Sequence, residues 1–302
     1  MFVLKSKYQM LTRVAFAPDG RGLAAAGKLG AYWWASVFDD PKGEPVAAGD
    51  CNGVGFAAGG AHLFASVYSP TGRTELTAVA LADRARSAVP LQYSWTAVGV
   101  CPATGFAVTE SWVGGEMSGW TLGPDGALVR AWEAGAGQGS IGAAVAFGPG
   151  GAWFVRPARP DPHANSRNLT IHDAATGAAL RTVPGAEWVS AGPAVSPDGE
   201  WIAFGSANTL CVQSATDPRR RASAANDNTH QFTGLAVHPG GRFLAVTNND
   251  KTVKLYDTTT WDVARAFTWD IGRMRSIAFS PDGTLAAAGS DTGKVVVWDV
   301  DV

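Results

Sequence analysis

Four polar residues could carry acid–base chemistry or hold a metal ion: Asp50, Glu187, His230 and Asp270. Carboxylates and imidazoles act as general acids and bases, and they are also common ligands of divalent metals. The four residues lie far apart in the chain, so only the fold could bring them together. A hydrolytic site made from them is an alternative that the sequence leaves open.

Short catalytic motifs are not found in the sequence. A nucleophile elbow needs Gly-x-Ser-x-Gly, whereas residues 139–142 read Gly-Ser-Ile-Gly. A phosphate-binding loop would need Ser or Thr after Gly293-Lys294, where the chain has a valine. No calcium loop of the type Asp-x-Asp-x-Asp-Gly occurs. We therefore predict no catalytic residue, no cofactor and no metal ion.

Large aromatic, basic and sulfur-containing side chains recur just ahead of short apolar runs. Residues of these types supply the anchors of protein-binding surfaces. The predicted partner-binding residues are Tyr93, Trp95, Trp188, Phe232, Arg273 and Met274, with Trp112 and Arg159 at the rim. For Trp95, Trp188 and Phe232, the alternative is that they pack inside the protein.

A tight turn of the Ser-Pro-Asp-Gly type, or a variant of it, recurs seven times, at positions 18, 58, 102, 149, 197, 239 and 281. Successive turns are 40 to 48 residues apart. Each turn joins two apolar runs, as in a β-hairpin. Third and fourth runs follow, as at 168–172 and 178–183. Each period therefore predicts four strands, which make one blade of a propeller.

The ends of the chain predict how the ring closes. The last repeat stops at 298–302, directly after its third strand, and an unassigned run, 2–8, precedes the first inner strand. We predict that this run supplies the missing strand, since an open end leaves unpaired backbone groups. An extra turn at 123–126 falls inside the third period and is assigned to its last two strands. The predicted fold is all-β, with residues 1–302 forming a single domain, a seven-bladed β-propeller of four-stranded antiparallel blades.

Composition limits the classes of partner. The chain has 302 residues, 46% of them hydrophobic, and a formal charge of −2, so no overall field attracts nucleic acid or a membrane surface. The basic run Arg219-Arg220-Arg221 is interpreted as a solvated turn. The three cysteines are odd in number and share no metal-type spacing, which favours buried thiols in a reducing compartment. We expect a cytoplasmic monomer that binds neither nucleic acid nor membrane.

Two segments carry a resemblance to a known family. Residues 249–257 read Asn-Asp-Lys-Thr-Val-Lys-Leu-Tyr-Asp, and residues 289–299 read Gly-Ser-Asp-Thr-Gly-Lys-Val-Val-Val-Trp-Asp. Both resemble the third-strand signature of the WD-repeat β-propeller family, and the repeated turns extend the resemblance over the whole chain. It is weakest in the second and third repeats.

The resemblance also implies a hydrogen-bonded network within each blade, which joins an Asp, a His, a Ser or Thr, and the Trp of the third strand. Asp250 matches the Asp, with Thr247 and His230 as its possible partners, but Tyr256 replaces the Trp. In the last repeat the Trp is present and Thr292 replaces the Asp. We therefore expect apolar packing to hold the blades more than such networks do.

The resemblance further implies a function, because most WD-repeat proteins look like non-catalytic assembly platforms. We expect a scaffold that binds a protein or peptide at the face where the loops between blades surround the channel mouth. The alternative is a propeller enzyme of the lactonase or other hydrolase type, with a metal or acid–base site at the same mouth.

Overall fold

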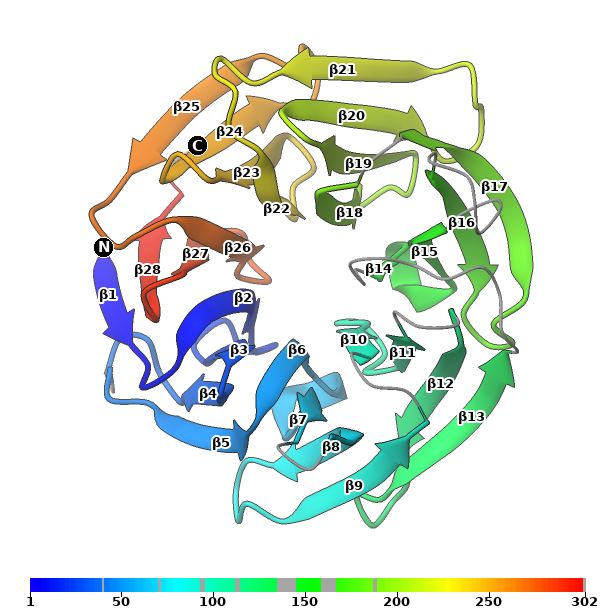
Figure 1. Ribbon diagram of the computed structural model, residues 1–302, viewed down its shortest axis with the longest axis vertical. Helices are drawn as coiled ribbons and strands as arrows, with labels where there is room; N and C mark the ends of the chain where they lie inside the picture. The colour runs from blue at the N-terminus through cyan, green and yellow to red at the C-terminus, as the bar shows by residue number, and fades with distance from the viewer. Residues whose placement is uncertain are drawn as a thin grey trace.

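The computed structural model of the protein is a ring of seven four-stranded antiparallel sheets (Figure 1). The structure describes residues 1–39, 41–69, 72–92, 96–111, 115–134, 145–158, 167–186 and 189–300. The predicted seven-bladed β-propeller is confirmed. Within the described ranges, helix is limited to two short 3₁₀ turns, η1 (Ala58–Gly60) and η2 (Pro149–Gly151), and no helix is long and apolar enough to cross a membrane.

The strands of each blade follow one another from the centre of the ring outward. Blade 1 contains β2 (Gln9–Phe16), β3 (Leu23–Lys28), β4 (Gly30–Trp34) and β5 (Glu44–Ala48). Blade 2 contains β6 (Asp50–Phe56), β7 (His62–Tyr68), β8 (Thr74–Ala80) and β9 (Arg86–Leu91). Blade 3 contains β10 (Thr96–Val100), β11 (Ala107–Ser111), β12 (Met117–Leu122) and β13 (Leu128–Ala134). Blade 4 contains β14 (Ala146–Phe147), β15 (Trp153–Ala158), β16 (Arg167–Asp173) and β17 (Ala179–Ala186).

The remaining three blades have the same order. Blade 5 contains β18 (Ala191–Val195), β19 (Trp201–Ser206), β20 (Thr209–Ser214) and β21 (Arg221–Ala225). Blade 6 contains β22 (Phe232–Val237), β23 (Phe243–Asn248), β24 (Thr252–Asp257) and β25 (Val263–Thr268). Blade 7 contains β26 (Met274–Phe279), β27 (Leu285–Ser290) and β28 (Lys294–Asp299), and its outer strand is β1 (Phe2–Lys5) from the other end of the chain.

The first strand closes the ring, as the sequence predicted. β1 pairs antiparallel with β28, with Phe2 opposite Val297 and Lys5 opposite Lys294. The N–H of Ser6 extends the ladder by donating to the carbonyl of Gly293 at 3.0 Å. In Figure 1 the blue β1 lies along the red β28. The pairing covers the outer edge of β28 and gives blade 7 the same four strands as the other blades.

The recurring turn has a local chemical cause. In the turn of blade 5, the Asp198 carboxylate accepts hydrogen bonds from the Ser196 hydroxyl and, at 2.9 Å, from the N–H of Glu200. These bonds hold the pKa of Asp198 below its ordinary value. Gly199 takes the left-handed conformation, φ 73°, that the turn requires. Blade 7 repeats the arrangement with Ser280 and Asp282. The turn therefore marks the connection between the first two strands of these blades in the sequence.

Apolar side chains fill the spaces between neighbouring blades. One cluster joins blades 7 and 1 through Leu4, Leu11, Trp34 and Val297 among others, all of them buried. At the centre, residues of all seven blades line an apolar cavity of about 600 Å³, whose rim carries prolines of the recurring turns. Cys51 and Cys101 are buried, whereas Cys211 is half-buried, so the prediction of buried thiols holds for two of the three cysteines. Burial raises the pKa of the Cys51 thiol to about 12.

Candidate functional site: the loop face

The antiparallel order of the strands gives the ring two faces with different connections. The loop face carries the connections between blades and those between the second and third strands of a blade, and its described residues include 9–10, 28–30, 49–50, 226–231, 249–251, 269–273 and 291–293. The turn face carries the hairpin turns and the connections to the outer strands, including 17–22, 197–200, 215–220, 239–242 and 258–262. The sequence predicts partner binding on this loop face, and among the predicted residues Arg273 lies there and is exposed.

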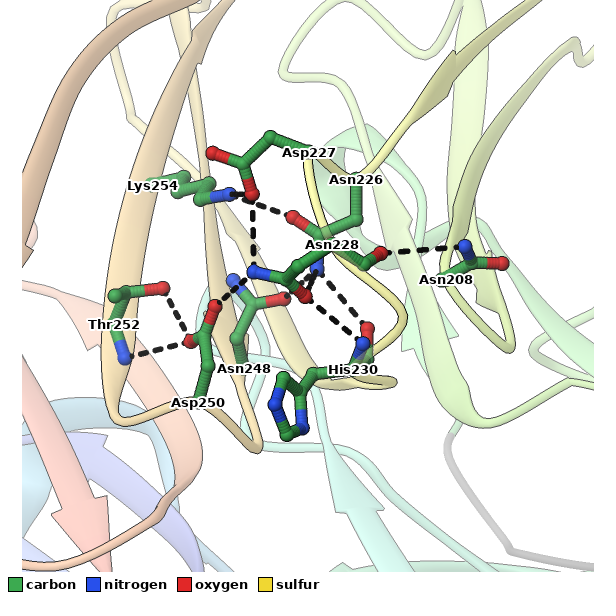
Figure 2. Close-up of polar contacts among 9 residues, drawn as sticks. All are labelled: Asn208, Asn226, Asp227, Asn228, His230, Asn248, Asp250, Thr252 and Lys254. Atoms are coloured by element: carbon green, nitrogen blue, oxygen red, sulfur yellow. Dashed lines mark hydrogen bonds and ion pairs between the residues drawn. The ribbon is translucent and has the colours of Figure 1, made fainter.

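A dense polar network holds the loop face between blades 5 and 6 (Figure 2). The buried ammonium of Lys254 donates to Asn226 Oδ1 at 2.6 Å and to the Asp227 carboxylate. The Asn226 amide donates in turn to Asn228 Oδ1 at 2.9 Å and to Asn248 Oδ1 at 3.1 Å. A buried charge is stable only when it is paired and hydrogen-bonded, and the network meets that need. It also fixes the loop that joins the two blades.

Asp250 belongs to the same network. Its carboxylate accepts from the Thr252 hydroxyl at 2.6 Å and from the Asn228 amide at 2.6 Å. Burial raises the pKa of Asp250, but these hydrogen bonds and the charge of Lys254 together bring it below its ordinary value. Burial and the nearby charges of Asp227 and Asp250 raise the pKa of Tyr256 to about 12. Asp250 therefore stays ionised and has a structural role.

The partners of Asp250 differ from those that the sequence suggested. Thr247 instead shares a 2.9 Å hydrogen bond with Thr233, and His230 joins the network through its backbone while its side chain is exposed. Asn228, two residues before His230, takes the expected place. In blade 7 the indole N–H of Trp298 has no partner among the described residues, so the family's network is incomplete there, as expected. Blade 6 therefore has a polar network, built partly from other residues than the family pattern implied, beside its apolar packing.

A second buried charge pair joins blades 3 and 4. Arg156 on β15 donates through Nη1 to Glu110 Oε1 on β11 at 2.6 Å, and both side chains are buried. The Arg156 Nε donates to His172 Nε2 at 3.3 Å, while His172 Nδ1 lies 2.9 Å from the carbonyl of Gly177. Burial and the charge of Arg156 lower the pKa of His172, although the bond to Gly177 opposes them. A neutral imidazole that donates from Nδ1 satisfies both contacts.

Two apolar side chains project from the loop face of blade 1. Met10 is 41% exposed and Leu29 is 56% exposed. Both have left-handed backbone conformations, with φ 52° for Met10 and 80° for Leu29, which residues with a Cβ rarely adopt. A β-bulge between Gln9 and Leu11 places Met10, and Gln9 pairs with Lys28, the residue before Leu29. The two side chains therefore leave neighbouring strands at the same edge of the sheet.

Backbone hydrogen bonds connect this edge to blade 7. The N–H of Met10 donates to the carbonyl of Asp291 at 3.1 Å, and the N–H of Asp291 donates to the carbonyl of Arg273 at 3.0 Å. Asp291 also accepts from the Arg273 N–H at 3.0 Å through Oδ1. The exposed Arg273 thus lies on the same surface as Met10 and Leu29. We call Met10, Leu29 and Arg273 the blade 7/1 patch.

The other predicted binding residues have different outcomes. Phe232 and Met274 are buried in the packing between blades, so the expectation that they contact a partner is revised to a core role. For Phe232 this was the stated alternative. Five of the residues lie outside the described part of the chain, and their role stays a prediction: Tyr93, Trp95, Trp112, Arg159 and Trp188. Met10 and Leu29 were not among the predicted residues, because the sequence shows neither the bulge in β2 at Met10 nor the left-handed conformation of Leu29.

The residues of the hydrolytic alternative are not joined in the described structure. Asp50 accepts a 3.0 Å hydrogen bond from the N–H of Leu29, and His230 and Asp270 are exposed. No hydrogen bond or ion pair links these three within the described ranges, and Glu187 lies outside them. Among the residues that the structure describes, no three His, Cys, Asp or Glu side chains are grouped to hold a metal ion.

Comparison with known proteins agrees with the fold. The family model for the WD domain, G-beta repeat, matches residues 224–257 and 269–299. Each match begins near an outer strand or inter-blade loop and ends with a third strand. The last two repeats therefore match WD repeats, and together with the seven-bladed fold they support the predicted WD-repeat family.

Curated relatives match between 25% and 35% of the chain. An uncharacterized WD repeat-containing protein of Synechocystis is 26% identical over 98 residues, which cover 32% of this chain and 28% of that protein. A probable cytosolic iron-sulfur protein assembly protein of Yarrowia lipolytica is 33% identical over 78 residues, 25% of this chain and 24% of that protein. The human serine-threonine kinase receptor-associated protein is 26% identical over 108 residues, 35% and 30% respectively. The matched region thus spans less than a third of each of these relatives.

Proposed function

We propose that the protein is a non-catalytic scaffold that binds a protein or peptide partner on its loop face. WD-repeat proteins are generally protein-interaction scaffolds, which supports the class of function. The blade 7/1 patch is the proposed centre of contact, because it combines exposed apolar side chains with an exposed arginine.

The observation that carries the proposal is the backbone conformation of Met10 and Leu29. A left-handed conformation costs a residue with a Cβ about 1 kcal/mol, and an exposed apolar side chain recovers none of that cost by burial. Gly or Asn would adopt the same backbone conformation at either position with less strain. A partner that buries the two side chains on binding would recover this cost, which gives Met10 and Leu29 a role at these positions.

The patch is also rigid enough to bind with little ordering cost. Met10, Asp291 and Arg273 are connected by backbone hydrogen bonds, so their positions are fixed before a partner arrives. Arg273 adds a cation at the edge of the apolar pair, which favours a partner that presents an apolar side chain beside a carboxylate. A peptide segment with this composition is the proposed ligand class.

The test replaces both apolar residues with asparagine, which accepts the left-handed conformation. The double variant Met10→Asn/Leu29→Asn is compared with wild type by affinity purification from lysate of the source organism with quantitative mass spectrometry. Leu180→Asn is the matched control, because Leu180 is 58% exposed and lies on the outer strand β17. We expect a partner that is retained by wild type and by the control but lost from the double variant, with unchanged melting temperature. Equal capture by all three proteins would refute the patch.

A further inference from the structure

A second surface feature lies on the turn face, between blades 5 and 6, away from the loop face. It is a pocket of about 480 Å³. Two tryptophans and three consecutive arginines line it: Trp201, Trp261, Arg219, Arg220 and Arg221. Its volume falls within the range of small-molecule sites. The basic run that the sequence indicated as a solvated turn is thus part of a concave, aromatic surface.

The two tryptophans come from different blades. Trp201 begins β19 of blade 5, and Trp261 lies in the turn that precedes β25 of blade 6. Their rings meet edge to face, with centroids 5.1 Å apart and an interplanar angle of 86°. Trp261 has φ 62°, a conformation that is rare for so bulky a residue, and its N–H donates to the carbonyl of Asp257 at 2.7 Å. The chain therefore holds the indole of Trp261 at the pocket against its backbone preference.

The turn that carries the arginines is held in place by hydrogen bonds from within. The buried amide of Gln213 donates to the carbonyls of Ser214, Asp217 and Arg220 at 3.3 to 3.5 Å. Asp217 Oδ1 accepts from the N–H of Arg219 at 2.9 Å. A turn fixed by a buried side chain presents its arginines without first having to order them.

The charge of the pocket is unbalanced. Glu200 is the acidic residue among its lining, against three arginines. None of the three arginines forms an ion pair with any residue that the structure describes, and all three are exposed. Asp257, at the adjoining turn, lies 3.7 Å from the guanidinium of Arg242, which offsets its charge. The pocket therefore presents unpaired guanidinium groups beside aromatic rings.

We propose that this pocket binds a phosphate monoester that carries a planar ring. Guanidinium groups match phosphate oxygens in pairs, and a phosphate monoester carries close to two negative charges at neutral pH. Indole rings stack on planar ligand rings, which adds binding energy beyond the ionic contacts. A nucleoside monophosphate and a phosphotyrosine side chain both have this chemistry. The site is separate from the blade 7/1 patch and does not depend on it.

Isothermal titration calorimetry of the whole chain tests the proposal with AMP, phosphotyrosine, inorganic phosphate and adenosine as probes. We expect AMP or phosphotyrosine to bind at least ten times more tightly than inorganic phosphate and adenosine, with affinity that falls as salt is added. The tighter of the two ring-bearing probes identifies the source of the ligand. Equal binding of inorganic phosphate and both ring-bearing probes would overturn the proposal, as would dissociation constants above about 1 mM for all four.

Variants separate the two parts of the pocket. Arg219→Gln/Arg221→Gln should weaken binding of the ring-bearing probe at least tenfold. Trp261→Leu should reduce the ratio between the affinity for the ring-bearing probe and the affinity for inorganic phosphate. The matched control is Arg73→Gln/Arg181→Gln, which removes the same charge from exposed arginines in blades 2 and 4. Circular dichroism melting checks that each variant folds. Unchanged affinity in the folded pocket double variant would overturn the proposal, and so would an equal loss in the control.

Discussion

The closing strand gives the sharpest prediction for stability. Leu4 is the inward-facing residue of β1, with 1% of its surface exposed, whereas the next residue toward the N-terminus, Val3, is 40% exposed. Truncating a buried leucine to alanine costs about 2 to 5 kcal/mol, because the transfer energy is lost and a cavity remains. The same change at half-exposed Val3 should cost less than about 1 kcal/mol. Leu4→Ala should therefore lower the free energy of unfolding by about 3 kcal/mol, and Val3→Ala serves as its control.

Removal of residues 1–5 extends the same test to the whole strand. The deletion abolishes four paired positions, at about 1 kcal/mol each, in addition to the burial of Leu4. The total is about 7 kcal/mol, which is comparable with the whole stability of many domains. Urea denaturation measures the loss, and amide hydrogen exchange should show faster exchange in β28 than in β23. An unchanged urea midpoint, or equal losses for Leu4→Ala and Val3→Ala, would contradict closure by β1.

Two further predictions concern the buried charges between blades 3 and 4. Glu110→Gln leaves Arg156 buried beside a neutral amide and should lower the free energy of unfolding, measured by urea denaturation, by about 3 kcal/mol. Glu133→Gln, in the exposed pair with Arg130, should lower it by less than about 0.5 kcal/mol. Similar losses for both variants would show that the buried pair adds no stability. Because the folded state lowers the pKa of His172 from its ordinary 6.5, the unfolded chain binds the proton more readily, and stability should fall as pH drops below 6.5. The free energy of unfolding should fall less steeply with pH in His172→Asn than in wild type. Parallel curves for the two proteins between pH 7 and 5 would contradict this role of His172.

The architecture could be read from local sequence signals. The turn glycines donate N–H bonds to carbonyls three or four residues back, as Gly199 does to Ser196. Where the turn also has an Asp, it accepts from residues two positions away, as Asp198 does from Ser196 and Glu200. Local signals of this kind recur at a fixed period, so they gave the number of blades and, with the spare segment at 2–8, the way in which the ring closes. The WD-repeat resemblance was likewise carried by short continuous segments.

The sites depend on contacts that no local pattern encodes. Phe232 and Met274 were predicted to contact a partner, with a core role as the alternative for Phe232. Each is the first residue of an inner strand, where a side chain can point into the packing between blades or toward the channel mouth, and both point into the packing. Asn228 replaced the expected partners of Asp250 because the loop between blades 5 and 6 folds back onto blade 6.

What the sequence alone determined is the periodic unit, because strands and tight turns are stabilised by neighbours along the chain. Only the tertiary structure decided which residues from different units meet. Arg219 and Trp261, for example, are separated by about one repeat of the sequence. They line one pocket because adjacent blades pack side by side. Contacts between blades follow from the curvature of the ring, and that curvature has no signature in any single repeat.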